Sequence, residues 1–232
     1  MKITNNNQTF EFEITLKNIK SIIIKIDSNK SIKISAPRYI TQKQIKDFII
    51  LKWNWIKKSL EKVERQTANR FVIEPNSSIT MLENTYYIEI KLSTANNIQI
   101  DQNKLIFYCI DNSQDTLKQI MINFLKNYNY TFFNSLLIKC SDKANIGFVP
   151  DLSLRYMVSR WGVCHINKKK IVLNSVLSFL PIECIEYVIM HELTHFYHAN
   201  HSKDFYNKLS QFFPEYKGVE TILKNFNVRM LE

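Results

Sequence analysis

The segment His191–Ser202, "HELTHFYHANHS", constrains the fold more than any other part of the chain. His191 and His195 are four residues apart, so on an α-helix their imidazoles lie on one face, one turn from each other. Two imidazoles at this spacing can converge on one zinc ion, with bonds of about 2.0–2.1 Å. Glu192 is rotated by about 100° from His191 and can reach a water on the open side of such an ion. The pattern H-E-x-x-H thus predicts a helix that supplies two metal ligands and a general base.

Two further histidines compete for the place of a third ligand. His198 follows His195 by three residues and lies on the same helical face, but at 1.5 Å per residue it is about 10.5 Å along the axis from His191. One small ion does not easily bind both ends of that row. His201 would lie farther still on a continuous helix, so it becomes a ligand only if the helix stops before it.

Signals for a helix stop lie between these histidines. Asn200 tolerates the left-handed conformation that ends helices, and Ser202 can cap a new helix over "KDFYNKLSQFF". A turn at Asn200 would let His201 return toward the metal. His201 is therefore the favoured third ligand, and His198 is the alternative or, otherwise, a surface or neighbouring histidine. A helix whose histidines are merely solvated is the competing interpretation of the whole segment.

Strand-like patterns dominate the first half of the chain. Residues 10–16 alternate between apolar and polar side chains, and residues 21–26 and 31–36 form an expected hairpin. Thr41 then caps one long helix over residues 42–63. The next stretch holds short apolar segments typical of antiparallel strands: RFVI, SIT, TYYIEIKL, NIQI and KLIFYCI.

The second half is mainly helical, beginning with a long helix over residues 114–140. A polar stretch precedes this helix, and we place a domain boundary there, between regions 1–112 and 113–232. Two strands, 152–157 and 170–174, are joined by the loop "VSRWGVCHINKK". The second of them is expected at a sheet edge beside the H-E-x-x-H helix, where a peptide can add as a further strand. The fold class is α+β: an antiparallel β-rich N-terminal region, then a helical region with a small hairpin or sheet before the H-E-x-x-H helix.

The net charge of +10 and the pI near 9.3 favour anionic partners. Basic residues are spread along the chain, and the longest run is Lys168–Lys170, so a solubilising surface is the plainer explanation. The alternative function is a nucleic-acid-associated protein, whose metal site is structural or belongs to a DNA-linked protease. Trp53 and Trp55, with the lysines around them, motivate this alternative and an expected weak contact with nucleic acid.

Nothing in the sequence indicates export or membrane insertion. The four cysteines lack C-x-x-C spacing, and the first residues contain no apolar signal segment. The longest apolar runs are far shorter than a membrane span. We therefore expect a soluble, cytoplasmic protein with reduced thiols and no membrane partner.

Two segments of the C-terminal half resemble one known family. "SRWGVCHINKKKIVLNSVLSFLP" and "HELTHFYHANHSKDFY" look like the YgjP-like metallopeptidases. Those proteins carry R-W-G-S-C, an L-N strand, and H-E-L-x-H-x-x-x-x-N-H-S followed by an aromatic residue. The resemblance is specific there and weaker in the N-terminal half, where "APRYIT" and "WNWIKKSL" are similar. It implies a zincin-like catalytic region over 113–232, and it offers one compact YgjP-like domain as the alternative to two regions.

The resemblance also implies a function. His191, His195 and His201 would bind zinc, and Glu192 would be the catalytic carboxylate. The expected enzyme is a zinc-dependent metallopeptidase (a hydrolase, or protease) that cleaves a peptide or protein substrate with metal-activated water. Glu192 would act as its general base.

The segment before the L-N strand departs from the family pattern at Val163, where the family has serine, so any role of that hydroxyl is absent or dispensable. Arg160 can steady an oxyanion or form a structural ion pair. Trp161 is expected to pack, with a substrate contact as the alternative, and Cys164 is expected to be a small buried hydrophobic residue. His165 is expected at a solvated loop position, with a metal site formed by "GVCH" together with the other histidines as the alternative.

Overall fold

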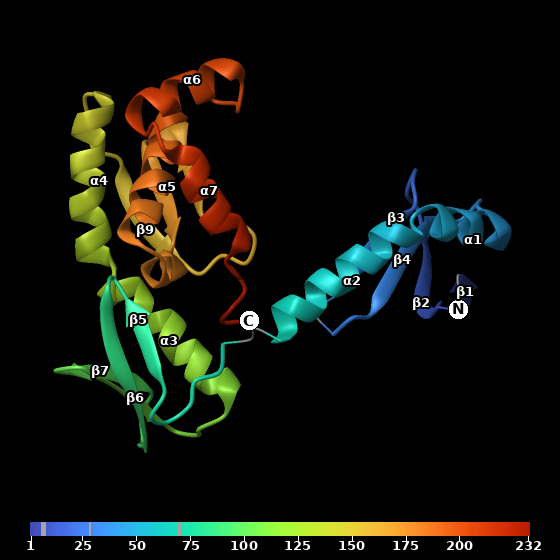
Figure 1. The fold of residues 1–232 in the computed structure, drawn as a ribbon, viewed down its shortest axis with the longest axis horizontal. Helices are drawn as coiled ribbons and strands as arrows, with labels where there is room; N and C mark the ends of the chain where they lie inside the picture. The colour runs from blue at the N-terminus through green and yellow to red at the C-terminus, as the bar shows by residue number, and fades with distance from the viewer. Residues whose placement is uncertain (6–7, 28, 69–70) are drawn as a thin grey trace. The chain divides into compact units, whose positions relative to one another are not determined.

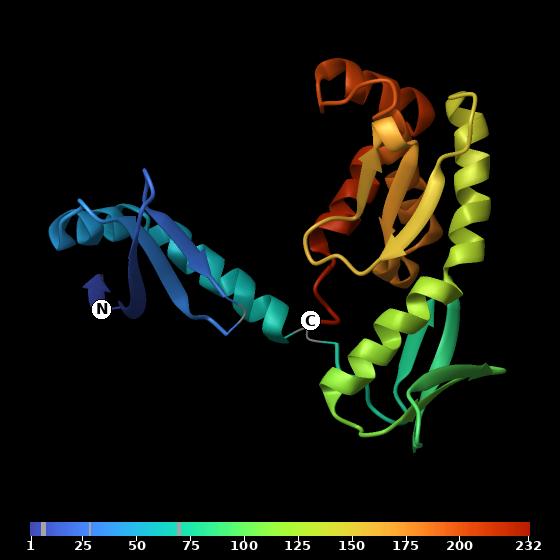
Figure 2. The same cartoon turned by 180° about the vertical axis from the view of Figure 1, so that it is seen from behind.

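The computed structural model describes residues 1–5, 8–27, 29–68 and 71–232 (Figure 1, and from behind in Figure 2). Contacts group the chain into two compact units, Met1–Arg70 and Phe71–Glu232. The predicted boundary between residues 112 and 113 lies inside the second unit, because the helix after it packs on the sheet before it. Among the described residues, no helix combines the length and the apolar character needed to cross a lipid bilayer.

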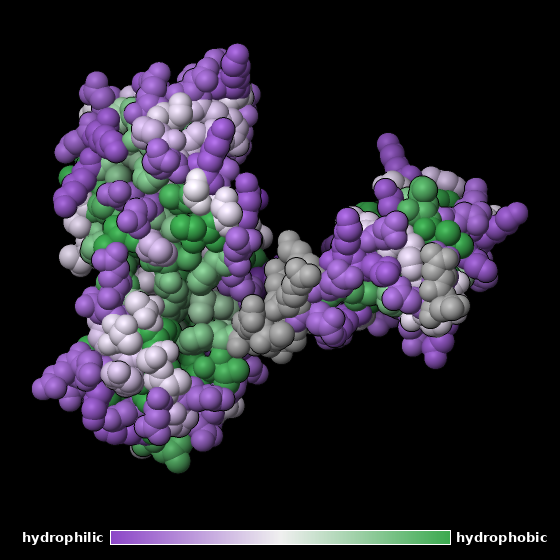
Figure 3. Space-filling view, in the orientation of Figure 1, coloured by the Kyte–Doolittle hydropathy of each residue, from purple (hydrophilic) through white to green (hydrophobic). Residues whose placement is uncertain are grey.

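The described part of the first unit forms a four-stranded sheet in the order β1-β2-β4-β3. The strands are β1 (Lys2–Asn5), β2 (Gln8–Lys17), β3 (Ile23–Ile26) and β4 (Ile32–Pro37). The predicted hairpin is confirmed, since β3 and β4 pair antiparallel, whereas β2 and β4 pair parallel. Apolar residues of the sheet and of the helices that follow form one core. Hydrophilic side chains cover much of this unit on the face drawn in Figure 3.

The helix predicted over residues 42–63 is two helices, α1 (Gln42–Leu51) and α2 (Trp53–Ala68). Thr41 caps α1 as predicted, in a reciprocal capping box with Gln44. Lys52 interrupts the helix, with φ −92° and ψ 6°. The buried apolar residues of both helices, among them Ile49 and Ile56, contact the same core. A break of one residue leaves the helical spacing almost unchanged, so the periodicity alone did not reveal it.

The second unit begins with a sheet in the order β5-β6-β8-β7. Its strands are β5 (Ser78–Met81), β6 (Asn84–Leu92), β7 (Asn97–Asp101) and β8 (Lys104–Cys109). The expectation of a wholly antiparallel region is wrong, because β6 and β8 pair parallel. Within the segment RFVI, residues 71–73 form no strand, and Arg70 lies outside the described residues. Helix α3 (Gln114–Tyr128) packs on this sheet.

The helix predicted over residues 114–140 is also two helices, α3 and α4 (Tyr130–Ala144). Asn129 lies between them and is fully buried. Its side-chain Nδ2 donates to the Ser175 carbonyl at 2.8 Å. This bond joins the junction of the helices to a segment 46 residues later in the chain, so the break depends on a tertiary contact. Helix α4 then packs into a second core together with the elements around the candidate site.

The second sheet of this unit has the order β10-β11-β9. Its strands are β9 (Asp151–Arg155), β10 (Gly162–His165) and β11 (Lys170–Asn174). The segment predicted as a loop thus contains β10 and the short 3-10 turn η1 (Ile166–Lys168). Strand β11, which we expected at an edge, is the central strand, since it pairs with β10 on one side and β9 on the other. Among the described strands, β10 therefore forms an edge.

The chain ends with η2 (Ser175–Phe179), α5 (Ile182–Thr194), α6 (Lys203–Phe212) and α7 (Tyr216–Asn225). Helix α5 is buried among α4, α6, α7 and the β9–β11 sheet, which Figure 2 shows in front of it. The predicted α+β class is confirmed in its broad form, while the sheets of the described residues are small and mixed. Helix α5 carries most of the candidate site.

Candidate metal centre

Helix α5 presents His191 and Glu192 in its last turn. The helix ends at Thr194, with His195 as its C-cap at φ −63° and ψ −20°. The predicted stop at Asn200 is therefore wrong, and Asn200 is not among the described residues with positive φ. The chain turns earlier, because the N–H groups of both Tyr197 and His198 donate to the Thr194 carbonyl.

This turn brings His201 back to α5. Nε2 of His201 lies 2.9 Å from Nε2 of His191, and one nitrogen from each of His191, His195 and His201 lies within 4.8 Å of the others. Ligand nitrogens on a tetrahedral zinc with bonds of about 2.0–2.1 Å are separated by about 3.3–3.4 Å. The observed separations are compatible with such an ion, so this donor set fits a metal.

A residue that the sequence reasoning missed, Phe205, supports all three rings. Its side chain is fully buried, and its ring centroid lies 4.9 Å from that of His191 and 4.8 Å from those of His195 and His201. Ser202 caps α6 as predicted, accepting from the Phe205 N–H at 3.4 Å. The cap fixes the start of α6, and this places Phe205 beneath the histidines. The sequence feature that could have revealed this role is an aromatic residue three positions after the helix cap Ser202.

His198 contributes its backbone instead of its side chain. Its carbonyl oxygen lies 3.2 Å from Nδ1 of His195, a contact that orients the ring and leaves Nε2 for a metal. The His198 side chain does not belong to the only group of potential metal ligands found among the described residues. His165 is also outside that group; its side chain is exposed as predicted, but it ends strand β10 instead of lying in a loop.

Burial favours the uncharged form of two of the clustered imidazoles, His191 and His195. Burial, with smaller contributions from His195 and His201, lowers the pKa of His191 to about 3. The pKa of His195 is also lowered, mainly by burial. An imidazole must be unprotonated to bind a metal, so this environment favours the ligand form. Nδ1 of His191 is buried, and it has no hydrogen-bond partner among the residues that the structure describes.

Glu192 is buried beside strand β10, with a relative exposure of 6%. A Cβ atom at Gly162 would lie 2.5 Å from its Oε1 atom, so only glycine leaves room for this carboxylate. Burial raises the pKa of Glu192 to about 8, against a hydrogen bond from the Cys164 backbone and the charge of Arg160. Arg160 thus acts on Glu192 at a distance, without a direct ion pair among the described residues.

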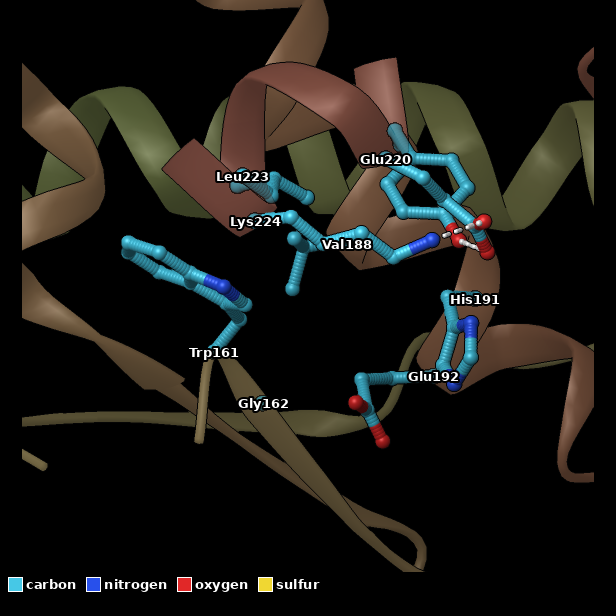
Figure 4. Close-up of a pocket in the computed structure, with 9 residues that line it drawn as sticks. Trp161, Gly162, Val188, His191, Glu192, Glu220, Leu223 and Lys224 are labelled. Carbon is cyan, nitrogen blue, oxygen red and sulfur yellow. Dashed lines mark hydrogen bonds and ion pairs between the residues drawn. The ribbon is translucent and has the colours of Figure 1, made fainter. Parts of the chain in front are cut away.

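The other residues of the segment 161–164 differ in their contacts. Cys164 is half-buried, and burial raises the pKa of its thiol to about 12. Val163 pairs with Val172 across the β10–β11 ladder. Trp161 packs against Phe226, with ring centroids 5.8 Å apart, and also lines a pocket beside His191 and Glu192 (Figure 4). Packing and substrate contact, which the sequence presents as alternatives for Trp161, are therefore compatible.

Comparisons with solved structures give weak similarities. The metallopeptidase zymogen abylysin of Pyrococcus abyssi is 21% identical, with a TM-score of 0.37 over 39% of this chain and 90% of that one. The metallopeptidase zymogen jannalysin of Methanocaldococcus jannaschii is 24% identical, with a TM-score of 0.36; the match covers 39% of this chain and 92% of that one. Wss1 from Saccharomyces cerevisiae is 22% identical, with a TM-score of 0.28; the match covers 66% of this chain and 98% of that one.

A search of curated proteins gave no significant match. The family comparison gives a clear assignment, because the model of the YgjP-like metallopeptidase domain matches residues 20–226, which is most of the chain. It covers the histidine cluster, Glu192 and the β9–β11 sheet. The chain therefore belongs to the YgjP-like family of metallopeptidases.

Proposed function

We propose that this metallopeptidase is a zinc enzyme in which His191, His195 and His201 bind the ion and Glu192 is the general base. The observation that carries the proposal is the convergence of three imidazoles beside one buried carboxyl group. A purely structural zinc site usually has four protein ligands. The group found here offers three, which leaves a position for water or substrate.

The proposed reaction is the hydrolysis of a peptide bond. Zinc, when bound by the three imidazoles, supplies a Lewis acid that activates water and polarises the scissile carbonyl. Glu192 takes a proton from the attacking water as the new C–O bond forms, and it delivers this proton to the amine nitrogen as the C–N bond breaks. A carboxyl group with a pKa near neutrality can both accept and release a proton, and burial moves Glu192 into that range.

We further propose that the substrate main chain pairs with the edge of β10, instead of β11 as first expected. The Asn174 N–H donates to the Trp161 carbonyl across the sheet. Because hydrogen-bonded pairs alternate along an antiparallel ladder, the main-chain groups of Gly162 and Cys164 point toward the outer edge, where the Cys164 N–H bonds to Glu192. Glu192 lies at this same edge, so a peptide added there would pass the proposed base.

The experiment uses the zinc-loaded full chain and a library of peptides, with cleavage products identified by mass spectrometry. Glu192→Gln is expected to bind zinc with unchanged stoichiometry and to lose about 10²–10⁴-fold in rate. His201→Ala is expected to lose zinc, whereas the matched variant His198→Ala keeps it. Hydrolysis that survives in zinc-bound Glu192→Gln would overturn the assignment of the base.

A second function is proposed for the first unit, because the charge of the chain is concentrated there. Residues 1–70 contain 15 Lys and Arg against 6 Asp and Glu, a net charge of +9, whereas residues 71–232 contain 16 against 15, a net charge of +1. Trp53 is a core residue that stacks on Phe10, but Trp55 is half exposed. An exposed aromatic ring among lysines can stack on a base, so we propose that this unit binds nucleic acid.

Binding of single-stranded DNA by the full chain, followed by fluorescence anisotropy at several salt concentrations, tests this second function. Replacing Lys52, Lys57 and Lys58 with Gln should weaken binding and flatten its salt dependence. Replacing Lys168–Lys170 with Gln removes the same charge from the second unit and should have little effect. Equal losses in the two triple variants, or no binding at low salt, would contradict the proposal.

A further inference from the structure

A pocket of about 270 Å³ opens beside the histidine cluster (Figure 4). Three elements line it: the start of β10, the last two turns of α5, and α7. The residues from α5 lie on one helical face and include His191 and Glu192. These two residues belong to the proposed catalytic site as well, so a group that enters the pocket lies next to the reacting bond.

The walls of the pocket are mainly apolar. Figure 4 shows Trp161 on one side of the space and His191 and Glu192 on the other, with Val188 and Leu223 between them. Leu223 and Val188 have relative exposures of 6% and 3% and belong to the core of the second unit. Trp161 is held by its contact with Phe226. The walls are therefore fixed by packing.

At the polar end of the pocket, the carboxylate of Glu220 already has hydrogen-bond donors within the protein. Oε1 of Glu220 accepts from the Tyr187 hydroxyl at 2.9 Å, and Oε2 accepts from Nζ of Lys224 at 3.3 Å. Both carboxylate oxygens thus have a donor, and the charges of Glu220 and Lys224 offset each other. A charged side chain at this end of the pocket would lose its hydration while Glu220 and Lys224 are already paired with each other.

We infer that this pocket binds one large apolar side chain, aliphatic or aromatic, of a residue next to the scissile bond. The volume lies just below the range of about 300–1,000 Å³ typical of pockets for drug-sized ligands, so a single side chain fits better than a larger ligand. The pocket selects substrates by size and polarity, with Trp161 and Leu223 as its specificity-determining walls. The position next to the scissile bond rests on the proposed function.

Binding can be measured without catalysis by ¹⁹F NMR of the full chain labelled with 5-fluorotryptophan. The sequence contains three tryptophans, and Trp161→Phe identifies the resonance of Trp161. The probes are N-acetyl amides of leucine, phenylalanine, aspartate and lysine. The two apolar probes should shift the Trp161 resonance saturably, and the two charged probes should not. The resonances of Trp53 and Trp55, which belong to the first unit, are internal controls.

A variant pair sharpens this binding experiment. Leu223→Ala enlarges the pocket and should weaken binding of the leucine probe by about 10-fold or more, since even one methylene changes discrimination by about 10–200-fold. Ile222→Ala, at an exposed neighbouring position of α7, should leave binding unchanged. Equal shifts with charged and apolar probes on the unmodified chain would overturn the inference, and that comparison needs no variant to fold.

Cleavage separates this inference from the proposed function. Among peptides that differ at one position beside the scissile bond, replacing a large apolar residue with aspartate should lower kcat/KM by about 10-fold or more. Cleavage without any side-chain preference would overturn the pocket inference and leave the proposed function standing. Apolar probes that bind at Trp161 in a zinc-loaded chain that cleaves no peptide would support the pocket and overturn the proposed function.

Discussion

Replacing Gly162 with alanine tests the proposed role of Glu192 without changing any charged group. The added Cβ would lie 2.5 Å from Oε1, 2.7 Å from Cγ and 2.8 Å from Cδ of Glu192, whereas ordinary contact begins at 3.4 Å. The carboxylate must therefore move by about 0.9 Å. A displacement of about 1 Å at a catalytic group can cost about 10²-fold in rate. Because Glu192 is buried, the same crowding should lower the free energy of unfolding by about 1–3 kcal/mol.

The assay compares kcat/KM on one cleaved peptide, zinc stoichiometry and urea unfolding for each variant. Gly162→Ala should keep its zinc, because the three histidines are held by α5, the turn after it and Phe205. The matched control is Gly218→Ala in α7, where an added Cβ has no neighbour within 4 Å; it should be fully active and up to about 1 kcal/mol more stable. Normal activity and stability in Gly162→Ala, or loss of zinc, would refute the reasoning.

Three further predictions concern stability. Asn129→Ala should destabilise the chain by about 0.5–1.5 kcal/mol in urea unfolding, because it removes a buried hydrogen bond to the Ser175 carbonyl, which keeps only the Ser178 hydroxyl as a side-chain donor; the exposed Asn127→Ala should cost much less. Removing zinc with a chelator should lower the free energy of unfolding of the second unit, and not of the first, as measured by calorimetry. The expected loss is about 4.1 kcal/mol relative to the chain with zinc at 1,000 times its Kd. Hydrogen bonds from Ser113 and Thr116 hold the pKa of Asp111 below its ordinary value. The stability that these hydrogen bonds contribute is complete above the unfolded pKa of about 3.9, and it is lost as the pH falls through the lower folded pKa. When unfolding is measured at decreasing pH, Asp111→Asn should therefore lose less stability than the unmodified chain.

Local features of the structure were predictable because they depend on residues within one helical turn. The spacing of His191 and His195 places two imidazoles on one face of any helix, and Glu192 must then lie beside them. The caps at Thr41 and Ser202 follow from side-chain oxygens near unpaired backbone N–H groups. In each case the determining partners are at most four residues apart, so the sequence alone specifies the contact.

Breaks in helices were not predictable from apolar spacing, and one of them involves a contact with a distant residue. Asn129 separates α3 from α4 while bonded to the carbonyl of Ser175, far along the chain. Lys52 separates α1 from α2, although the apolar spacing across it is nearly continuous. Helical periodicity reports which face is buried, and it does not report whether one residue has left the helix.

The sequence by itself determined that a helix carries two histidines and a glutamate, and it nominated His201 as their partner. Tertiary structure decided how His201 reaches them: the helix ends at Thr194, before the expected stop, and Phe205 supports the three rings. It also decided that Gly162 faces Glu192 and that α7 closes a pocket against α5. The physical reason is that helical spacing is a property of neighbouring residues, whereas the close approach of separate elements depends on how the whole core packs.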